Sequence, residues 1–254
     1  MASIDLNSDC GEGYGPWAMG DDPGILDVVS SANIACGGHA GDPDTIARTI
    51  ALARERGVSV GAHPGYMDPM GFGRRVIPMS LPAIERMVAH QVGAFGGVAA
   101  LAGVHVGHVK PHGALNNLAC VDREVADAIA RGVRAVMPDT TLLAVARTEL
   151  HAAGEAAGLR VAAEIFADRT YRADATLTPR SEPGAVLHDA DDCARRVVRM
   201  VERGAVIAED GTEIATAIDS ICVHGDEPSA VAVARCVRDA LERAGHHIAP
   251  FGTA

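Results

Sequence analysis

The feature that most constrains the fold is a repeated alternation of short apolar segments with longer segments of helical pattern. Each short segment is rich in β-branched or small apolar residues, which is typical of buried strands. Strands that alternate with helices indicate a parallel sheet, because a helix is the usual connection between parallel neighbours. The predicted strands lie at residues 4–7, 32–35, 58–61, 104–109, 142–145, 161–165 and 220–223.

Helix signals fill the segments between these strands. Asp42 is a suitable cap for a helix that Pro43 begins, and Ser80 precedes a second apolar pattern of helical period. The turn Asp210-Gly211 between two apolar runs indicates a β-hairpin within residues 204–218. We therefore predict a single α/β domain spanning residues 1–254, an irregular seven-stranded (β/α) barrel, with an open doubly wound sheet as the alternative. Further helices are predicted at residues 122–136, 148–157, 190–203 and 228–244.

Composition excludes several classes of function. Only 3% of the residues are aromatic, so the core must be built from aliphatic side chains, which suits helices packed on a parallel sheet. The net charge of −11, with no long basic cluster, disfavours binding to nucleic acid. Residues 92–109 carry no formal charge, but their five glycines make them a poor membrane span. Scattered cysteines without a C-x-x-C pair, and no apolar leader, favour a cytoplasmic protein.

Polar and titratable side chains follow six of the seven predicted strands. In a (β/α) barrel the C-terminal ends of all strands meet at one rim, where the reacting groups lie. Each residue alone has an ordinary explanation as a turn, a cap or a structural hydrogen bond, but together they predict a functional site. The set comprises Asn7, Asp9, His39, His63, Lys110, His112, Glu164, Asp168, Arg169, His224 and Asp226.

Lys110 carries the strongest single signal. A lysine at the end of a buried strand must be desolvated or paired, and no capping role explains it. Lys110 and His112 would together suit a site that stabilises negative charge on a phosphoryl group or an oxyanion. Glu164 and Asp168 are the candidates for a general base or for holding a metal–nucleotide complex.

Other residues suggest ion and substrate binding. Asp9, His39 and His63 follow three successive strands and could hold a divalent cation with open positions for water. The planar guanidinium of arginine suits a carboxylate, and several arginines lie on the loops that follow the strands. The glycine-rich nucleotide loops G-x-G-x-x-G and G-x-x-x-x-G-K-[ST] and the G-x-S-x-G elbow are absent from the sequence. The candidates for substrate binding are Arg74, Arg75, Arg169, Arg180, Asn7, His224 and Asp226.

Six sequence blocks together resemble a known family: "DLNSDCGEGYG", "SANIACGGHAGDP", "GAHPGYMDPMGFGRR", "VKPHGALNN", "EIFADRTY" with "PRSEPGA", and "CVHGD". Their order and content are similar to the LamB/YcsF family of 5-oxoprolinase A subunits. The resemblance implies a barrel of the glycoside hydrolase/deacetylase type. It also implies a cytoplasmic role in hydrolysing 5-oxoproline to glutamate with ATP and Mg²⁺, together with partner subunits B and C. Two positions depart from the family pattern, Asn116 in place of a tyrosine and Ala175 in place of a glycine.

The resemblance suggests roles for the candidate residues. Phosphorylation of the lactam oxygen would make the ring carbon attackable, with Lys110 balancing the phosphoryl charge and His112 acting as donor or acid. Asp9 and Glu164 would position water or a metal, and Arg75 or Arg169 would bind the substrate carboxylate. Two alternatives stay open: a metal-dependent amidohydrolase or deacetylase-like carbohydrate enzyme that acts alone, and a non-catalytic protein that binds substrate and presents it to its partners.

Overall fold

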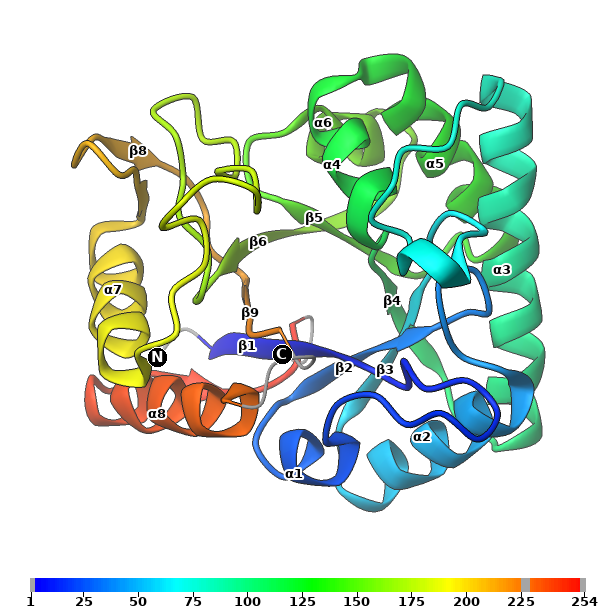
Figure 1. The fold of residues 1–254 in the computed structure, drawn as a ribbon, viewed down its shortest axis with the longest axis horizontal. Helices are drawn as coiled ribbons and strands as arrows, with labels where there is room; N and C mark the ends of the chain where they lie inside the picture. The colour runs from blue at the N-terminus through cyan, green and yellow to red at the C-terminus, as the bar shows by residue number, and fades with distance from the viewer. Residues whose placement is uncertain (1–2, 225–228, 252–254) are drawn as a thin grey trace.

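In the computed structural model, which describes residues 3–224 and 229–251, parallel strands close into a barrel (Figure 1). The last barrel strand pairs with both the sixth strand and the first, so the sheet has no open edge at that point. The closure rules out an open doubly wound sheet and confirms the predicted irregular seven-stranded barrel. The barrel strands are β1 (Ser3–Cys10), β2 (Ser31–Ala35), β3 (Ser59–His63), β4 (Val106–Val109), β5 (Thr141–Val145), β6 (Arg160–Phe166) and β9 (Ser220–Cys222).

Helices surround the barrel and cover its outer face. The predicted cap is confirmed, since the Asp42 carboxylate accepts hydrogen bonds from the backbone N–H groups of Asp44 and Thr45. None of the helices within the described residues is long and apolar enough to span a membrane. The helices are α1 (Asp22–Leu26), α2 (Pro43–Glu55), the 3₁₀ turn η1 (Pro69–Gly71), α3 (Leu81–Leu101), α4 (Gly113–Val121), α5 (Arg123–Val136), α6 (Glu149–Ala156), α7 (Ala190–Arg203) and α8 (Ala230–Arg243).

Short elements account for most differences from the sequence prediction. The predicted hairpin is confirmed as β7 (Ala205–Ile207) and β8 (Glu213–Ala215), which pair antiparallel. Helices α1 and α4 and the two-residue strand β10 (His247–Ile248) were not predicted, because none of them is long enough to show a clear apolar period. The start predicted for the last helix, residue 228, lies outside the described residues.

The interior of the barrel is polar. Because side chains alternate along a strand, Leu6 of β1 faces the helices while its neighbours Asn7 and Asp5 face inward. Asn7 hydrogen-bonds Glu164 of β6, although β1 and β6 are not neighbours in the sheet. Such a contact can be made only across the lumen, so polar side chains replace the branched apolar layers that fill most barrels of this class.

One glycine shows how closely this interior is filled. The imidazole of His108 lies against Gly61 of the neighbouring strand, and a Cβ added at Gly61 would lie 2.1 Å from His108 Nε2. His108 Nε2 in turn contacts the amide oxygen of Asn33 at 2.7 Å and therefore donates to it. Burial, reinforced by the charge of Lys110, lowers the pKa of His108 to about 3, so the ring is neutral.

We expect Gly61→Ala to destabilise the fold by about 1–3 kcal/mol or more, because the new methyl group overpacks the lumen against His108. The matched control is Gly97→Ala on an exposed turn of α3, where an added Cβ meets nothing within 4 Å. That change should stabilise the fold by about 0.5–1 kcal/mol through helix propensity. Urea denaturation measures both, and a Gly61→Ala variant as stable as the parent would contradict this packing.

Candidate functional site

Lys110 lies at the centre of the barrel mouth, immediately after β4. Its Nζ atom is 2.9 Å from Glu164 Oε1 and 3.1 Å from Asp9 Oδ1. It also lies 3.3 Å from Asn7 Oδ1 and 3.1 Å from the sulfur of Cys222. Only 3% of the residue is exposed. The pairing that the sequence required of a buried lysine is thus supplied by Asp9 of β1 and Glu164 of β6, the two strands that flank β9.

These contacts fix the charge of the group. Burial alone would lower the pKa of Lys110, but Asp9 and Glu164 outweigh it and hold that pKa well above its ordinary value. Burial likewise favours the neutral form of Asp9, but His63 and Lys110 hold the pKa of Asp9 well below its usual range. With one cation and two carboxylates, the ionised set of Asp9, Lys110 and Glu164 carries a net charge of −1.

Two asparagines orient the carboxylates. Asn7 donates from its amide nitrogen to Glu164 at 3.0 Å and to Ser220 at 2.8 Å. Asn33 donates to Asn7 Oδ1 at 2.7 Å and to Asp9 Oδ1 at 2.9 Å. Asn33 was missed in the sequence because it lies inside a predicted strand, where no strand-end signal marks it. Its contact with His108 holds the amide in the orientation that lets it donate to Asp9.

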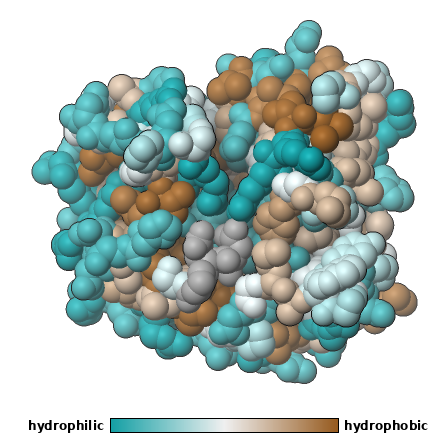
Figure 2. Space-filling view, in the orientation of Figure 1, coloured by the Kyte–Doolittle hydropathy of each residue, from teal (hydrophilic) through white to brown (hydrophobic). Residues whose placement is uncertain are grey.

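A cavity of about 600 Å³ opens above Lys110, a volume suited to a small-molecule ligand. Figure 2 shows a hollow near the middle of this face, bordered largely by hydrophilic residues. Asn116, which departs from the family pattern, is among the lining residues. Ala175 also lines the cavity and takes a φ of 69°, a left-handed conformation that glycine adopts more readily.

An aspartate–histidine pair lies beside this cavity, and its histidine, His224, lines the wall. His224 Nδ1 lies 2.7 and 2.9 Å from the two carboxylate oxygens of Asp168, so it donates to Asp168. In the neutral ring, Nε2 of His224 then keeps its lone pair for a proton. Burial raises the pKa of Asp168, but His224 outweighs it and lowers that pKa overall. The predicted site residue Asp226 lies outside the described residues.

The four candidate arginines have different environments. Arg169 donates to the backbone carbonyls of Ala185 and Thr178 at 3.1 and 2.6 Å, so it holds its own loop while lining the cavity. Arg75 is largely exposed and paired with Asp68, and it is not among the lining residues. Arg74 and Arg180 both line the cavity. The structure therefore separates Arg75 from the other three.

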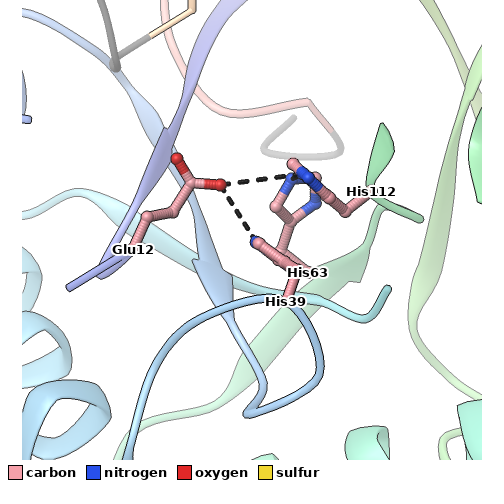
Figure 3. A group of neighbouring side chains, drawn as sticks. All are labelled: Glu12, His39, His63 and His112. Atoms are coloured by element: carbon pink, nitrogen blue, oxygen red, sulfur yellow. Dashed lines mark hydrogen bonds and ion pairs between the residues drawn. The ribbon is translucent and has the colours of Figure 1, made fainter. Parts of the chain in front are cut away.

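Beside Lys110, three buried histidines and one glutamate form a compact group (Figure 3). One nitrogen or carboxylate oxygen from each of Glu12, His39, His63 and His112 lies within 4.8 Å of all the others. Two of its members, His39 and His63, belong to the cation site predicted from the sequence. His112 and Glu12 are the other two members of the group. Asp9 flanks it, with Oδ2 3.4 Å from His63 Nε2. Glu12 was missed as a site residue because "GEGYG" has the composition of an ordinary turn.

Burial also sets the protonation of two of these rings. It lowers the pKa of His39 well below the usual value, and His63 adds to that effect. The pKa of His112 is lowered in the same way by burial and then by His39. The rings of His39 and His112 stack with centroids 3.6 Å apart. This part of the site therefore favours neutral imidazoles, which are metal ligands and proton acceptors.

The relatives of this chain agree with the sequence resemblance. It is 54% identical over 249 residues to the 5-oxoprolinase A subunit of Rhodopseudomonas palustris (strain BisB5), covering 98% of each chain. It is 51% identical to the protein of the same name in Azoarcus sp. (strain BH72), covering 96% of each chain. A crystal structure of "Lactam Utilization Protein" from Thermus thermophilus matches with a TM-score of 0.93 and 45% identity. That match covers 98% of this chain and 100% of the other. The model of the LamB/YcsF family matches residues 4–254, so the chain belongs to the LamB/YcsF family.

Proposed function

We propose that this chain is the A subunit of a cytoplasmic ATP-dependent 5-oxoprolinase that works with partner subunits B and C. The observation that carries the proposal is the buried Lys110, held between Asp9 and Glu164 at the floor of a ligand-sized cavity. The relatives' names, which refer to 5-oxoprolinase and to lactam utilization, supply the substrate class. ATP with Mg²⁺ would be the co-substrate.

The reaction opens the five-membered lactam of 5-oxo-L-proline to L-glutamate. One ATP and two water molecules are consumed for each glutamate, ADP and phosphate released. An amide is a poor electrophile, and transfer of the ATP γ-phosphoryl group to the lactam oxygen would activate the ring carbon. A first water would then add to that carbon and the ring C–N bond would break, with the ring nitrogen taking a proton. A second water would hydrolyse the resulting acyl phosphate to the glutamate side-chain carboxylate and phosphate. Catalysis of such steps rests on positioned charge and positioned proton carriers.

The charges around the cavity suggest a division of roles. With a net charge of −1, the Asp9–Lys110–Glu164 set would repel an incoming phosphoryl group rather than bind it. We therefore assign anion binding to Arg74 and Arg180 on the cavity wall, in place of the phosphoryl role first expected of Lys110. Lys110 then fixes the two carboxylates for water and proton handling. Arg169, occupied with backbone carbonyls, positions the loop that carries Arg180.

The Asp168–His224 pair is the proposed general base. Asp168 holds the ring so that Nε2 can take a proton, as in other carboxylate–histidine pairs. His224 lines the cavity on the β9 side, and His112 lines it on the β4 side. Water activated by His224 could thus approach a substrate bound in the cavity above Lys110.

A second candidate function is a metal-dependent amidohydrolase that acts alone. The four-residue group of Glu12, His39, His63 and His112 favours it, because such a donor set suits a catalytic divalent ion. One assay distinguishes the two candidate functions. It measures glutamate release from 5-oxoproline with and without ATP and with and without subunits B and C. We expect release only when both are present, and release by the isolated chain without ATP would support the alternative.

We expect Lys110→Met to reduce ATP-coupled glutamate release by the assembled complex at least about 100-fold, since two carboxylates lose their common partner. It should also lower the free energy of unfolding by about 3–5 kcal/mol at neutral pH. That loss should shrink toward pH 5, because unpaired buried carboxylates have raised pKa values and cost less once protonated.

The control for Lys110→Met is the double variant Lys110→Met/Glu164→Gln, which removes one charge of each sign. It should recover part of the lost stability while staying inactive, and this separates the catalytic effect from the folding effect. Near-normal turnover in the single variant would dismiss the proposed role of Lys110.

The proposed anion-binding role of Arg180 predicts that Arg180→Gln raises KM for 5-oxoproline or ATP by roughly tenfold or more, with a smaller effect on kcat. The matched control is Arg75→Gln, since Arg75 is exposed and pairs with Asp68 outside the cavity. We expect the control to leave KM within about twofold of the parent, as for an exposed ion pair of little energetic weight. Steady-state kinetics of the complex measure both, and equal effects would argue against this assignment.

A further inference from the structure

The hydrogen bonds of His63 and His112 fix which ring nitrogen of each carries the proton. His63 Nδ1 lies 2.7 Å from the backbone carbonyl oxygen of Lys110. His112 Nε2 lies 2.9 Å from the backbone carbonyl oxygen of Phe72. A carbonyl oxygen can only accept, so Nδ1 of His63 and Nε2 of His112 are the protonated atoms. In the neutral rings the lone pairs are then on His63 Nε2 and His112 Nδ1.

Those two lone-pair atoms face each other at 3.0 Å. Two unprotonated nitrogens repel at such a distance unless something positive lies between or beside them. One solution is a metal ion bound to both, and the other is an extra proton shared by the pair.

Two further donors face the same point. Glu12 Oε1 lies 3.0 Å from His39 Nε2 and 3.7 Å from His112 Nδ1. Metal–ligand bonds of about 2.0–2.1 Å in a tetrahedron place ligand atoms roughly 3.3 Å apart, close to these separations. The four donors come from four successive places around the barrel mouth: His63 ends β3, and the other three follow β1, β2 and β4 (Figure 3). Gly73 permits this convergence, since a Cβ there would lie 2.8 Å from His39 and 2.9 Å from His112.

We propose that Glu12, His39, His63 and His112 form a binding site for one late first-row divalent cation, best fitted by Zn²⁺ or Co²⁺. Three imidazoles and one carboxylate match the ligands that these ions prefer, whereas Mg²⁺ takes oxygen ligands. His63 and His112 line the cavity, so the site borders the space where the substrate would bind. The site differs from the Mg²⁺ that accompanies ATP, and it does not depend on the proposed reaction.

Cobalt titration of the metal-stripped full chain tests the proposal. We expect one Co²⁺ per chain, visible absorption bands of a low-symmetry four- or five-coordinate ion, and displacement by equimolar Zn²⁺. Zn²⁺ should also raise Tm, since a ligand that binds the folded state stabilises it. Elemental analysis of the loaded chain provides an independent count.

Variants locate the site. Glu12→Gln keeps the shape of the side chain but removes its charge, and His112→Ala removes a ring; each should weaken Co²⁺ binding at least about 100-fold. The matched control is His90→Gln, an exposed histidine of α3 outside the group. The control should bind Co²⁺ like the parent, and circular dichroism should show that every variant is folded.

Several results would overturn the proposal. Failure of the folded parent chain to bind one equivalent of Co²⁺ or Zn²⁺ would do so, as would unchanged binding in both Glu12→Gln and His112→Ala. Nitrogen-15 NMR of the histidines in the metal-stripped chain shows the alternative directly. If His63 and His112 still share a proton after stoichiometric Zn²⁺ is added, that proton, and not a metal ion, accounts for the 3.0 Å contact between their nitrogens. This result would overturn the proposal.

Discussion

The structure depends on one buried ammonium group placed between two carboxylates inside a closed barrel. Lys110, Asp9 and Glu164 come from three strands that are not sheet neighbours, so their contacts cross the lumen. Each charge would be costly alone in such a setting, and together they are tolerated because every one has partners. The lumen must therefore be lined with hydrogen-bonding groups rather than with branched apolar side chains.

This constraint links the core of the barrel to its mouth. Asn7 and Asn33 tie the carboxylates to Ser220 and His108 deeper in the lumen, and Gly61 provides the room that the ring of His108 needs. The same network places the Asp9–Lys110–Glu164 set directly beneath the cavity. Stability and site geometry thus rest on the same contacts, and a change that loosens the lumen should also disturb the residues placed to act on substrate.

Local patterns made the strands and the main helices predictable, because each depends on neighbours in the sequence such as the Asp42 cap. Strand ends also identified Lys110 and Asp168, since barrel topology brings such ends together. Partners inside a strand, such as Asn33, give no local signal, because their roles arise from contacts between strands far apart in the sequence. Arg75 shows the opposite case, because its residue type and its loop predicted substrate binding. In the structure it pairs with Asp68 and does not line the cavity.

Lys110 is the only lysine in the sequence, so its charge can be measured without interference. Labelling the protein with nitrogen-15 lysine gives a single side-chain resonance, whose pH titration reports the state of Nζ. We expect an ammonium signal that persists above about pH 10.5, the ordinary range for lysine, with slow proton exchange because the group is buried and paired. A signal that titrates at or below that pH would contradict an ammonium ion held between Asp9 and Glu164.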